Sequence, residues 1–141
     1  MNLSKNFTLE EMTVTDCGLA NVPNQEQRNC MNELVKNVLQ PLRDTLGMPI
    51  KITSGFRSIP VNKAVGGADR PISQHTKGQA ADLKCADNSE LFSIIRDHLV
   101  FDQLIWEKGN DVQPAWVHVS YKTQGNRGEI LKFKNGKYQR I

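Results

Sequence analysis

The order of the sequence patterns predicts an α+β fold in a single domain, residues 1–141. Apolar residues spaced for a helix dominate the first third of the chain, whereas runs typical of strands come mostly later. Helices and strands that are segregated along a chain favour an α+β fold over a doubly wound sheet, in which they alternate. We therefore expect a small antiparallel sheet flanked by N-terminal helices, and 141 residues are enough to bury one core.

Two helices are predicted in the N-terminal third. Thr8 begins a capping box with the glutamate three residues later, which starts a short helix. Asn24 is the next N-cap, and the helix that follows ends at Gly47, shortly before a proline. Pro41 interrupts this helix, so we expect a kink or a helix-to-helix junction there. The apolar positions of the longer helix recur at three- and four-residue steps on one face: Met31, Leu34, Val35, Val38, Leu39, Leu42 and Leu46.

Strands are predicted from runs rich in apolar and β-branched residues. These runs are PIKITSG (49–55), AADLK (80–84), FDQLIWE (101–107) and AWVHVSY (115–121). Asn135-Gly136 is the strongest short turn signal of the chain and predicts a hairpin within residues 129–141. Two further short helices are expected, one over residues 61–65 and one over 89–99, the second capped by Ser89 or Asn88.

Composition and charge exclude several classes of protein. The formal net charge of +3 comes without a dense run of Lys and Arg, so we expect no nucleic-acid partner. No segment approaches the ~18 apolar residues of a membrane span, and the N-terminus lacks a signal-peptide core. We therefore expect no membrane partner and a protein that is cytoplasmic as synthesised. Cys17, Cys30 and Cys85 have no metal-binding spacing and predict buried free thiols.

The most informative segment is SQHTKGQAAD (73–82). It places the imidazole of His75 and the carboxylate of Asp82 seven positions apart, with small residues between them. A second imidazole, that of His118, lies in the apolar run WVHVS. If Asp82 and His118 occupy adjacent antiparallel strands, about 4.8 Å apart, both reach one ion. Two histidines and one carboxylate form the donor set of a catalytic zinc site, which keeps a fourth position for water.

Several motifs flank this segment: SGFRS and VNKAVGGA before it, and FDQLIWE and WVHVS after it. Together they resemble the zinc D-alanyl-D-alanine carboxypeptidase and endolysin family, whose wider group includes the D-Ala-D-Ala dipeptidases and the hedgehog signalling domain. The short phage-borne branch is the nearest, and the resemblance covers residues 7–121. It implies one Zn²⁺ per chain, bound by His75, Asp82 and His118, and cleavage of bacterial cell-wall peptides.

The resemblance also implies a general base. Glu107, which ends FDQLIWE, matches a glutamate that closes the strand before the last histidine ligand. Asp111 is the weaker alternative. Some members carry a second histidine two residues before that ligand, where this chain has Trp116, which cannot transfer a proton. We expect Glu107 to be catalytic.

Four residues are expected to contact the substrate. Arg57 of SGFRS matches an arginine near the scissile carbonyl or the substrate carboxylate, and its guanidinium fork suits either group. Arg57 is therefore expected to be both catalytic and substrate-binding. Ser73 and Gln74 immediately precede the first ligand, where a serine is a family feature, and Trp116 is expected to line the cleft or to pack beneath the sheet.

These expectations define a monomeric zinc metallopeptidase that cleaves the peptidoglycan stem peptide or its cross-links, as a carboxypeptidase or an endopeptidase. A phage or prophage lysis enzyme of this kind acts on the cell wall after release from the cytoplasm. The alternative is a non-catalytic zinc module that binds a cell-wall peptide or a protein partner, because the hedgehog branch uses the scaffold for signalling. Glu107 favours the enzyme, whereas Trp116 in place of a histidine keeps the alternative open.

Overall fold

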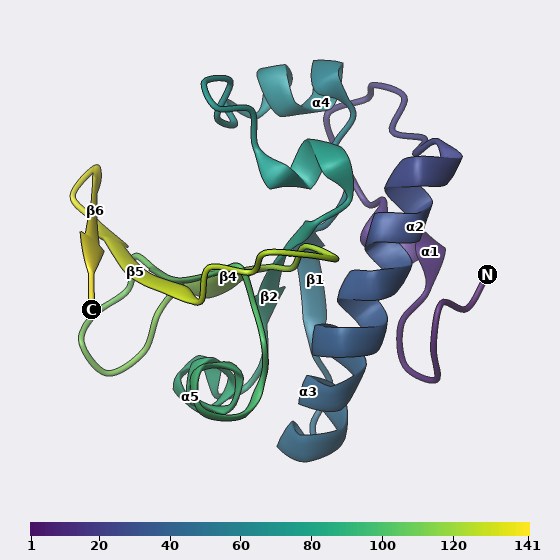
Figure 1. Cartoon of the computed structure of the whole chain (residues 1–141). Coiled ribbons are helices and arrows are strands. Elements are labelled where there is room, and N and C mark those ends of the chain that lie inside the picture. The colour runs from purple at the N-terminus through teal and green to yellow at the C-terminus, as the bar shows by residue number, and fades with distance from the viewer.

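A six-stranded mixed sheet lies at the centre of the computed structural model, which describes residues 1–141 (Figure 1). The strand order is β1-β2-β4-β3-β5-β6. The strands are β1 (Lys51–Ser54), β2 (Ala80–Lys84), β3 (Gln103–Glu107), β4 (Trp116–Ser120), β5 (Glu129–Lys134) and β6 (Lys137–Arg140). Helices pack on both sides of this sheet, so the predicted α+β fold class is confirmed.

Four of the five strand pairings are antiparallel, but β3 and β5 are parallel. The prediction of an antiparallel sheet is therefore wrong for this pair. Its cause is the position of β4, which lies between β2 and β3 and leaves only the far edge of β3 free. The chain crosses one end of the sheet over residues 121–128, so β5 starts where β3 starts. β5 and β6 then form the predicted hairpin about Asn135-Gly136, whose two residues both have positive φ.

The helices confirm most of the capping predictions. They are α1 (Leu9–Met12), α2 (Gln25–Leu34), the π-helix η1 (Val35–Leu39), α3 (Gln40–Leu46), α4 (Ile59–Ala64), the 3-10 helix η2 (Gln74–Lys77) and α5 (Asn88–His98). Thr8 and Asn24 each form a complete capping box. Pro41 lies in the first turn of α3, at the junction predicted there, and Gly47 ends that helix with a positive φ.

Three boundaries differ from the predictions. The N-cap of α5 is Asp87 rather than Ser89 or Asn88, because the Asp87 side chain accepts a hydrogen bond from the backbone N–H of Glu90. α4 begins at Ile59, two residues earlier than expected. The segment that carries His75, expected to be loop, is the 3-10 helix η2.

The two faces of the sheet have different roles. One face carries the apolar side chains that alternate along β2, β3 and β4, and it packs against α5 and the α2–η1–α3 rod (Figure 1). Five of its residues are fully buried: Ala81, Leu83, Leu104, Val117 and Val119. The opposite face carries the polar side chains of the same strands, and α4 and η2 lie on its side of the sheet. The alternation therefore separates a core face from a face that is free to bind a ligand.

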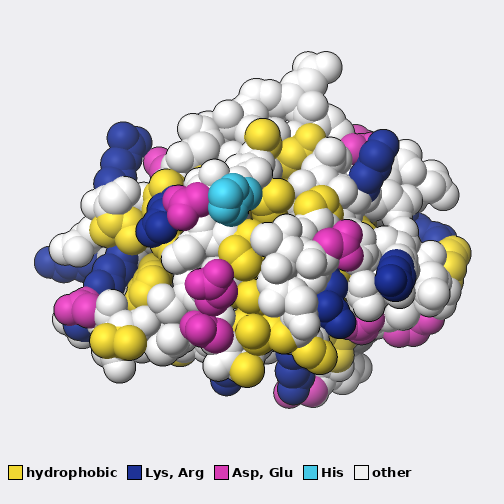
Figure 2. All heavy atoms as spheres, turned by 90° about the horizontal axis from the view of Figure 1, so that it is seen from below, with side chains coloured by type: hydrophobic (Ala, Val, Ile, Leu, Met, Phe, Trp, Pro, Cys, Tyr) yellow, Lys and Arg dark blue, Asp and Glu magenta, His cyan; other side chains and the backbone are white.

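Figure 2 shows the side of α5 and α3, where acidic, basic and apolar side chains are interspersed. No helix combines the length and the apolar composition needed to cross a membrane. Cys17, Cys30 and Cys85 are free, as predicted, but they are half-buried rather than buried.

Candidate metal centre

The strand register brings two of the predicted metal ligands together. Asp82 on β2 lies directly opposite His118 on β4, which confirms the expected adjacent antiparallel strands. His118 Nδ1 lies 3.1 Å from Asp82 Oδ1, and His75 Nε2 lies 3.5 Å from the same oxygen. One donor atom from each of the three residues lies within 4.8 Å of the others. The predicted set of two imidazoles and one carboxylate can therefore hold a single metal ion.

His75 is oriented by two hydrogen bonds, one to Ser73 in its own segment and one to Gly55, the residue that follows β1. Ser73 caps η2, and its Oγ accepts a hydrogen bond from the backbone N–H of His75. His75 Nδ1 lies 2.7 Å from the carbonyl oxygen of Gly55, which can only accept. The proton is therefore on Nδ1, and the lone pair of Nε2 faces Asp82. An outer partner of this kind fixes the tautomer and the ring orientation of a metal-binding histidine.

Burial and neighbouring charges hold these groups in the protonation states that a metal requires. Burial opposes the ionisation of Asp82, but its interactions with the two neighbouring imidazoles outweigh this effect and hold the pKa of Asp82 below its usual range. Burial lowers the pKa of His75, so its imidazole is neutral at pH 7. Metal ligands must be deprotonated to bind. An ionised carboxylate and a neutral His75 meet this condition without a metal.

Gly78 connects η2 to β2 and so sets the spacing between His75 and Asp82. Its φ is +75°, and its N–H closes η2 by donating to the carbonyl oxygens of Gln74 and His75. A Cβ at this position would lie 2.3 Å from the backbone oxygen of Gln27 in α2. Gly78 is therefore required both by its backbone conformation and by the close approach of η2 to α2.

Gly78→Ala is expected to destabilise the protein by more than about 2 kcal/mol, because the left-handed conformation alone costs an L-residue about 1–2 kcal/mol and a backbone clash is added. Gly125→Ala is the matched control, since Gly125 has a similar φ of +73° but a Cβ there would meet nothing within 4 Å. We expect the control to lose only about 1 kcal/mol. Denaturant unfolding measures both losses, and equal losses would contradict the clash.

Arg57 lies beside the candidate metal ligands and is held from two sides. Its Nε donates to Ser54 Oγ at 2.9 Å, and its Nη1 donates to Asn62 Oδ1 at 3.2 Å. Its Nη2 lies 3.5 Å from Asp82 Oδ2. Gly67 packs against this pair, since a Cβ there would lie 1.9 Å from Asn62 Oδ1. The guanidinium is thus positioned next to the site where a metal ion would lie.

Glu107 ends β3 directly opposite Trp116 on β4. Its side chain is buried, and its Oε1 has no hydrogen-bond partner. Burial raises the pKa of Glu107, which moves it toward the neutral range suited to a general base. Asp111, the weaker alternative, is exposed and ion-paired with Lys132, and it does not line the cleft that contains Glu107.

A cleft of about 640 Å³ contains all the predicted site residues. It lies on the polar face of the sheet, between the strands and the segment that runs from the end of α4 through η2. The predicted residues that line it are Arg57, Ser73, Gln74, His75, Asp82, Glu107, Trp116 and His118. Gln74 donates to Gln79 Oε1, and the indole N–H of Trp116 is buried without a partner. The structure brings these residues together, and their roles in binding or catalysis remain predictions.

The sequence did not indicate several further residues of the cleft, among them five that belong to β5, β6 and the ends of the strands. They are Asp102, Lys122, Arg127, Leu131 and Tyr138. Leu131 on β5 lies in the same cross-strand row as Ile105 and His118, so alternation along the predicted hairpin was the one available signal. Arg127 and Tyr138 depend on the parallel β3–β5 pairing, which local patterns do not show.

The comparison with known protein families agrees with this site. The family model described as Peptidase M15 matches residues 5–120, which include all three candidate metal ligands, Arg57 and Glu107. No curated protein matches the chain in sequence. The matched segment spans the chain from the turn before α1 to the end of β4, so it includes the whole candidate metal centre but not the β5–β6 hairpin. On this match, the chain belongs to the Peptidase M15 family.

Proposed function

We propose that this protein is a zinc metallopeptidase that cleaves peptide bonds of bacterial peptidoglycan. The observation that carries the proposal is the cluster of His75, Asp82 and His118 in one cleft with a buried, unpartnered carboxylate, that of Glu107. Membership of a peptidase family supports a hydrolytic role for this cluster.

His75, Asp82 and His118 are the residues that would hold Zn²⁺. When bound, the ion supplies Lewis-acid polarisation of the scissile carbonyl and activation of a water molecule. Glu107 accepts the proton of the attacking water and delivers it to the leaving amine, a role that its raised pKa favours. Arg57 offers N–H donors to the oxyanion that develops on the carbonyl.

Trp116 occupies the position where some relatives are expected to carry a second histidine. Indole can donate a hydrogen bond but cannot accept a proton. Its buried N–H lies close enough to the Glu107 carboxylate to lower the pKa of Glu107, so we propose that Trp116 lines the substrate cleft and orients Glu107. Ser73 and Gln74, which line the cleft beside His75, are proposed to contact the substrate backbone.

The alternative, a non-catalytic zinc module that binds a cell-wall peptide or a protein partner, does not account for Glu107. A buried polar atom without a partner costs about 1–3 kcal/mol, and a binding module gains nothing from this cost. A general base needs an oxygen that is free to accept a proton. The unpartnered Oε1 of Glu107 therefore supports the enzyme.

Digestion of purified peptidoglycan tests the proposal. The zinc-loaded protein is expected to release peptide fragments, whereas the chelator-stripped protein releases none until zinc is restored. Fragment masses identify the cleaved bond and thus distinguish a carboxypeptidase from an endopeptidase. Absence of release from several wall types, with zinc stoichiometrically bound, would favour the binding module.

We further propose that the protein is a monomer. It would act on the cell wall after release from the cytoplasm, as a phage or prophage lysis enzyme does.

A further inference from the structure

The cleft has a cationic end that the proposed mechanism does not use. Asp102 precedes β3, Lys122 follows β4 and Arg127 precedes β5. Because β3 is antiparallel to β4 and parallel to β5, these three residues lie at the same end of the sheet. Glu107 lies at the opposite end, and the candidate metal ligands lie between the two. All these residues line the cleft.

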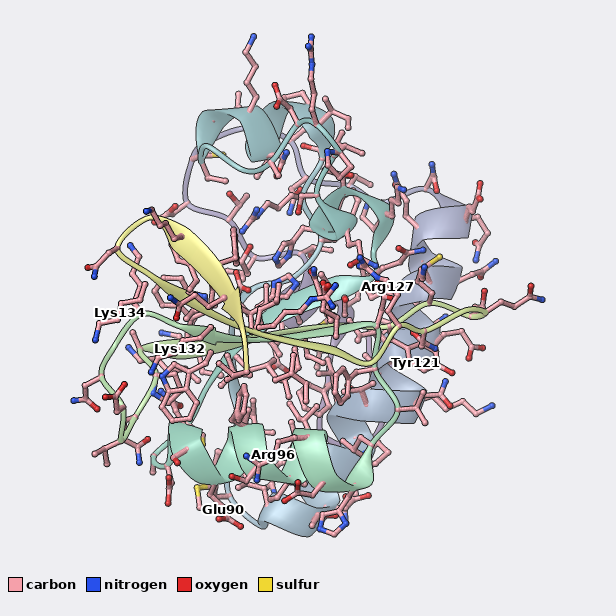
Figure 3. The ribbon with its side chains drawn as sticks, turned by 60° about the vertical axis from the view of Figure 1, so that its left-hand side comes forward. Glu90, Arg96, Tyr121, Arg127, Lys132 and Lys134 are labelled. Carbon is pink, nitrogen blue, oxygen red and sulfur yellow. The ribbon has the colours of Figure 1, made fainter.

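The buried carboxylate at this end is already paired. Asp102 is fully buried and accepts hydrogen bonds from the backbone N–H of Arg127 at 3.0 Å, from its Nε at 3.1 Å and from its Nη2 at 2.8 Å. In Figure 3, Arg127 lies on the side of the sheet that faces α4 and η2, which is the side of the cleft. Arg127 therefore pairs with Asp102, and its Nη1 also lies 3.8 Å from Glu129 Oε1, so it fixes the crossing segment.

Two lysines at this end, Lys77 and Lys122, carry positive charge that no hydrogen-bonded acid neutralises. Lys122 Nζ lies 3.6 Å from Asp102 Oδ1, beyond hydrogen-bond distance, and its side chain is about one-third exposed, at 36%. Lys77, the last residue of η2, lines the cleft and makes no ion pair and no side-chain hydrogen bond. A backbone hydrogen bond from Tyr121 N–H to the Gln79 carbonyl oxygen, at 2.9 Å, ties the two lysine segments together. Lys122 is only loosely paired with Asp102, and Lys77 has no acidic partner within ion-pair distance, so both ammonium groups are available to a ligand.

We propose that Lys77 and Lys122 bind a free carboxylate on the substrate peptide, two or three residues from the cleaved bond. The inference rests on the proposed function and names the kind of peptide that the site takes. Asp102 lies three positions before Ile105, which is in the cross-strand row of the candidate metal ligands. At roughly 3.3 Å per residue in a strand, the cationic end lies about 10 Å from the metal centre. Lys122 also lies outside the matched residues 5–120.

The test uses two synthetic stem pentapeptides that differ only in whether the α-carboxylate of the D-glutamate residue is free or amidated. We expect the protein to cleave the free acid with a KM about three- to tenfold lower, since a half-exposed ion pair contributes modestly, and with the same kcat. The variant Lys77→Gln/Lys122→Gln is expected to lose this preference. Lys5→Gln/Lys36→Gln removes two exposed lysines outside the cleft, so it is the charge-matched control and should keep the preference.

Equal KM values for the two peptides, or a double variant that retains the preference, would overturn the inference. Equilibrium binding of the same two peptides to the zinc-loaded protein separates this inference from the proposed function. If neither peptide is cleaved, the proposed function is in question, but tighter binding of the free acid would still support the cationic end. Equal affinities in that measurement would count against it.

Discussion

Glu107→Gln is expected to lower kcat by about a thousandfold, within the 10²–10⁴-fold contribution of a general acid or base, while zinc binding is retained. Glutamine has nearly the same volume as glutamate but cannot accept the proton of the attacking water. Glu107 is not one of the three clustered donors, so the metal should still bind. Steady-state kinetics and zinc stoichiometry of the same preparation measure the two effects.

The pH dependence of activity, compared between the wild type and Glu107→Gln, shows whether Glu107 acts as a titrating base. Burial raises the pKa of Glu107, and the base must be ionised to act. Wild-type activity is therefore expected to fall on acidification at a higher pH than that of an ordinary glutamate, and the residual activity of the variant should lack this limb. Glu90→Gln is the control, because Glu90 is exposed on α5, on the side of the sheet away from the cleft (Figure 3). Unchanged activity in Glu107→Gln would remove Glu107 from the mechanism.

Local chemistry made the N-terminal helices and the hairpin predictable. The capping boxes at Thr8 and Asn24 involve partners three residues away, and the turn at Asn135-Gly136 needs only two residues with positive φ. Asp87 was overlooked as the cap of α5 because two other capping residues, Asn88 and Ser89, follow it directly. Where several polar residues adjoin, the packing of the helix decides which one caps it.

The order of the strands could not be predicted in the same way. β5 pairs directly with β3, although β4 lies between them in the sequence. The alternation of side chains within each strand is compatible with either direction of pairing. Asp102 shows the consequence for the site. In the sequence it is one acid beside Phe101, whereas the fold buries it against an arginine 25 positions later. Only that pairing brings Arg127 to the cationic end of the cleft, and no local signal indicated it.

The metal site was predictable because its requirements are partly local. A spacing of seven positions between two donors, with small side chains between them, allows a tight turn, and a histidine within an alternating strand has a defined face. These features predicted that His75, Asp82 and His118 lie together, and the structure clusters them, whereas the orientation of His75 depends on the carbonyl of Gly55, which no motif indicates. The family match over residues 5–120 includes all three positions.

His118→Ala is expected to abolish both stoichiometric zinc binding and peptide cleavage. Removing a group that hydrogen-bonds to a metal ligand already weakens metal binding by roughly 10–100-fold. Removing a ligand itself should weaken metal binding further. The fold should persist, because the neighbours Val117 and Val119 point into the core from the opposite face of β4 and are fully buried. Far-ultraviolet circular dichroism of the variant checks this.

Thermal unfolding with and without zinc completes the test of the metal site. A ligand that binds only the folded state stabilises it, by about 2.7 kcal/mol when its concentration is 100-fold above its Kd. Zinc should therefore raise the Tm of the wild-type protein but not that of His118→Ala. His98→Ala is the control, since His98 is exposed at the end of α5 and is absent from the cluster, so its zinc-induced shift should equal that of the wild type. If His118→Ala kept the full shift and its activity, the ion would have to be held by other residues, and the placement of the catalytic centre between β2 and β4 would be wrong.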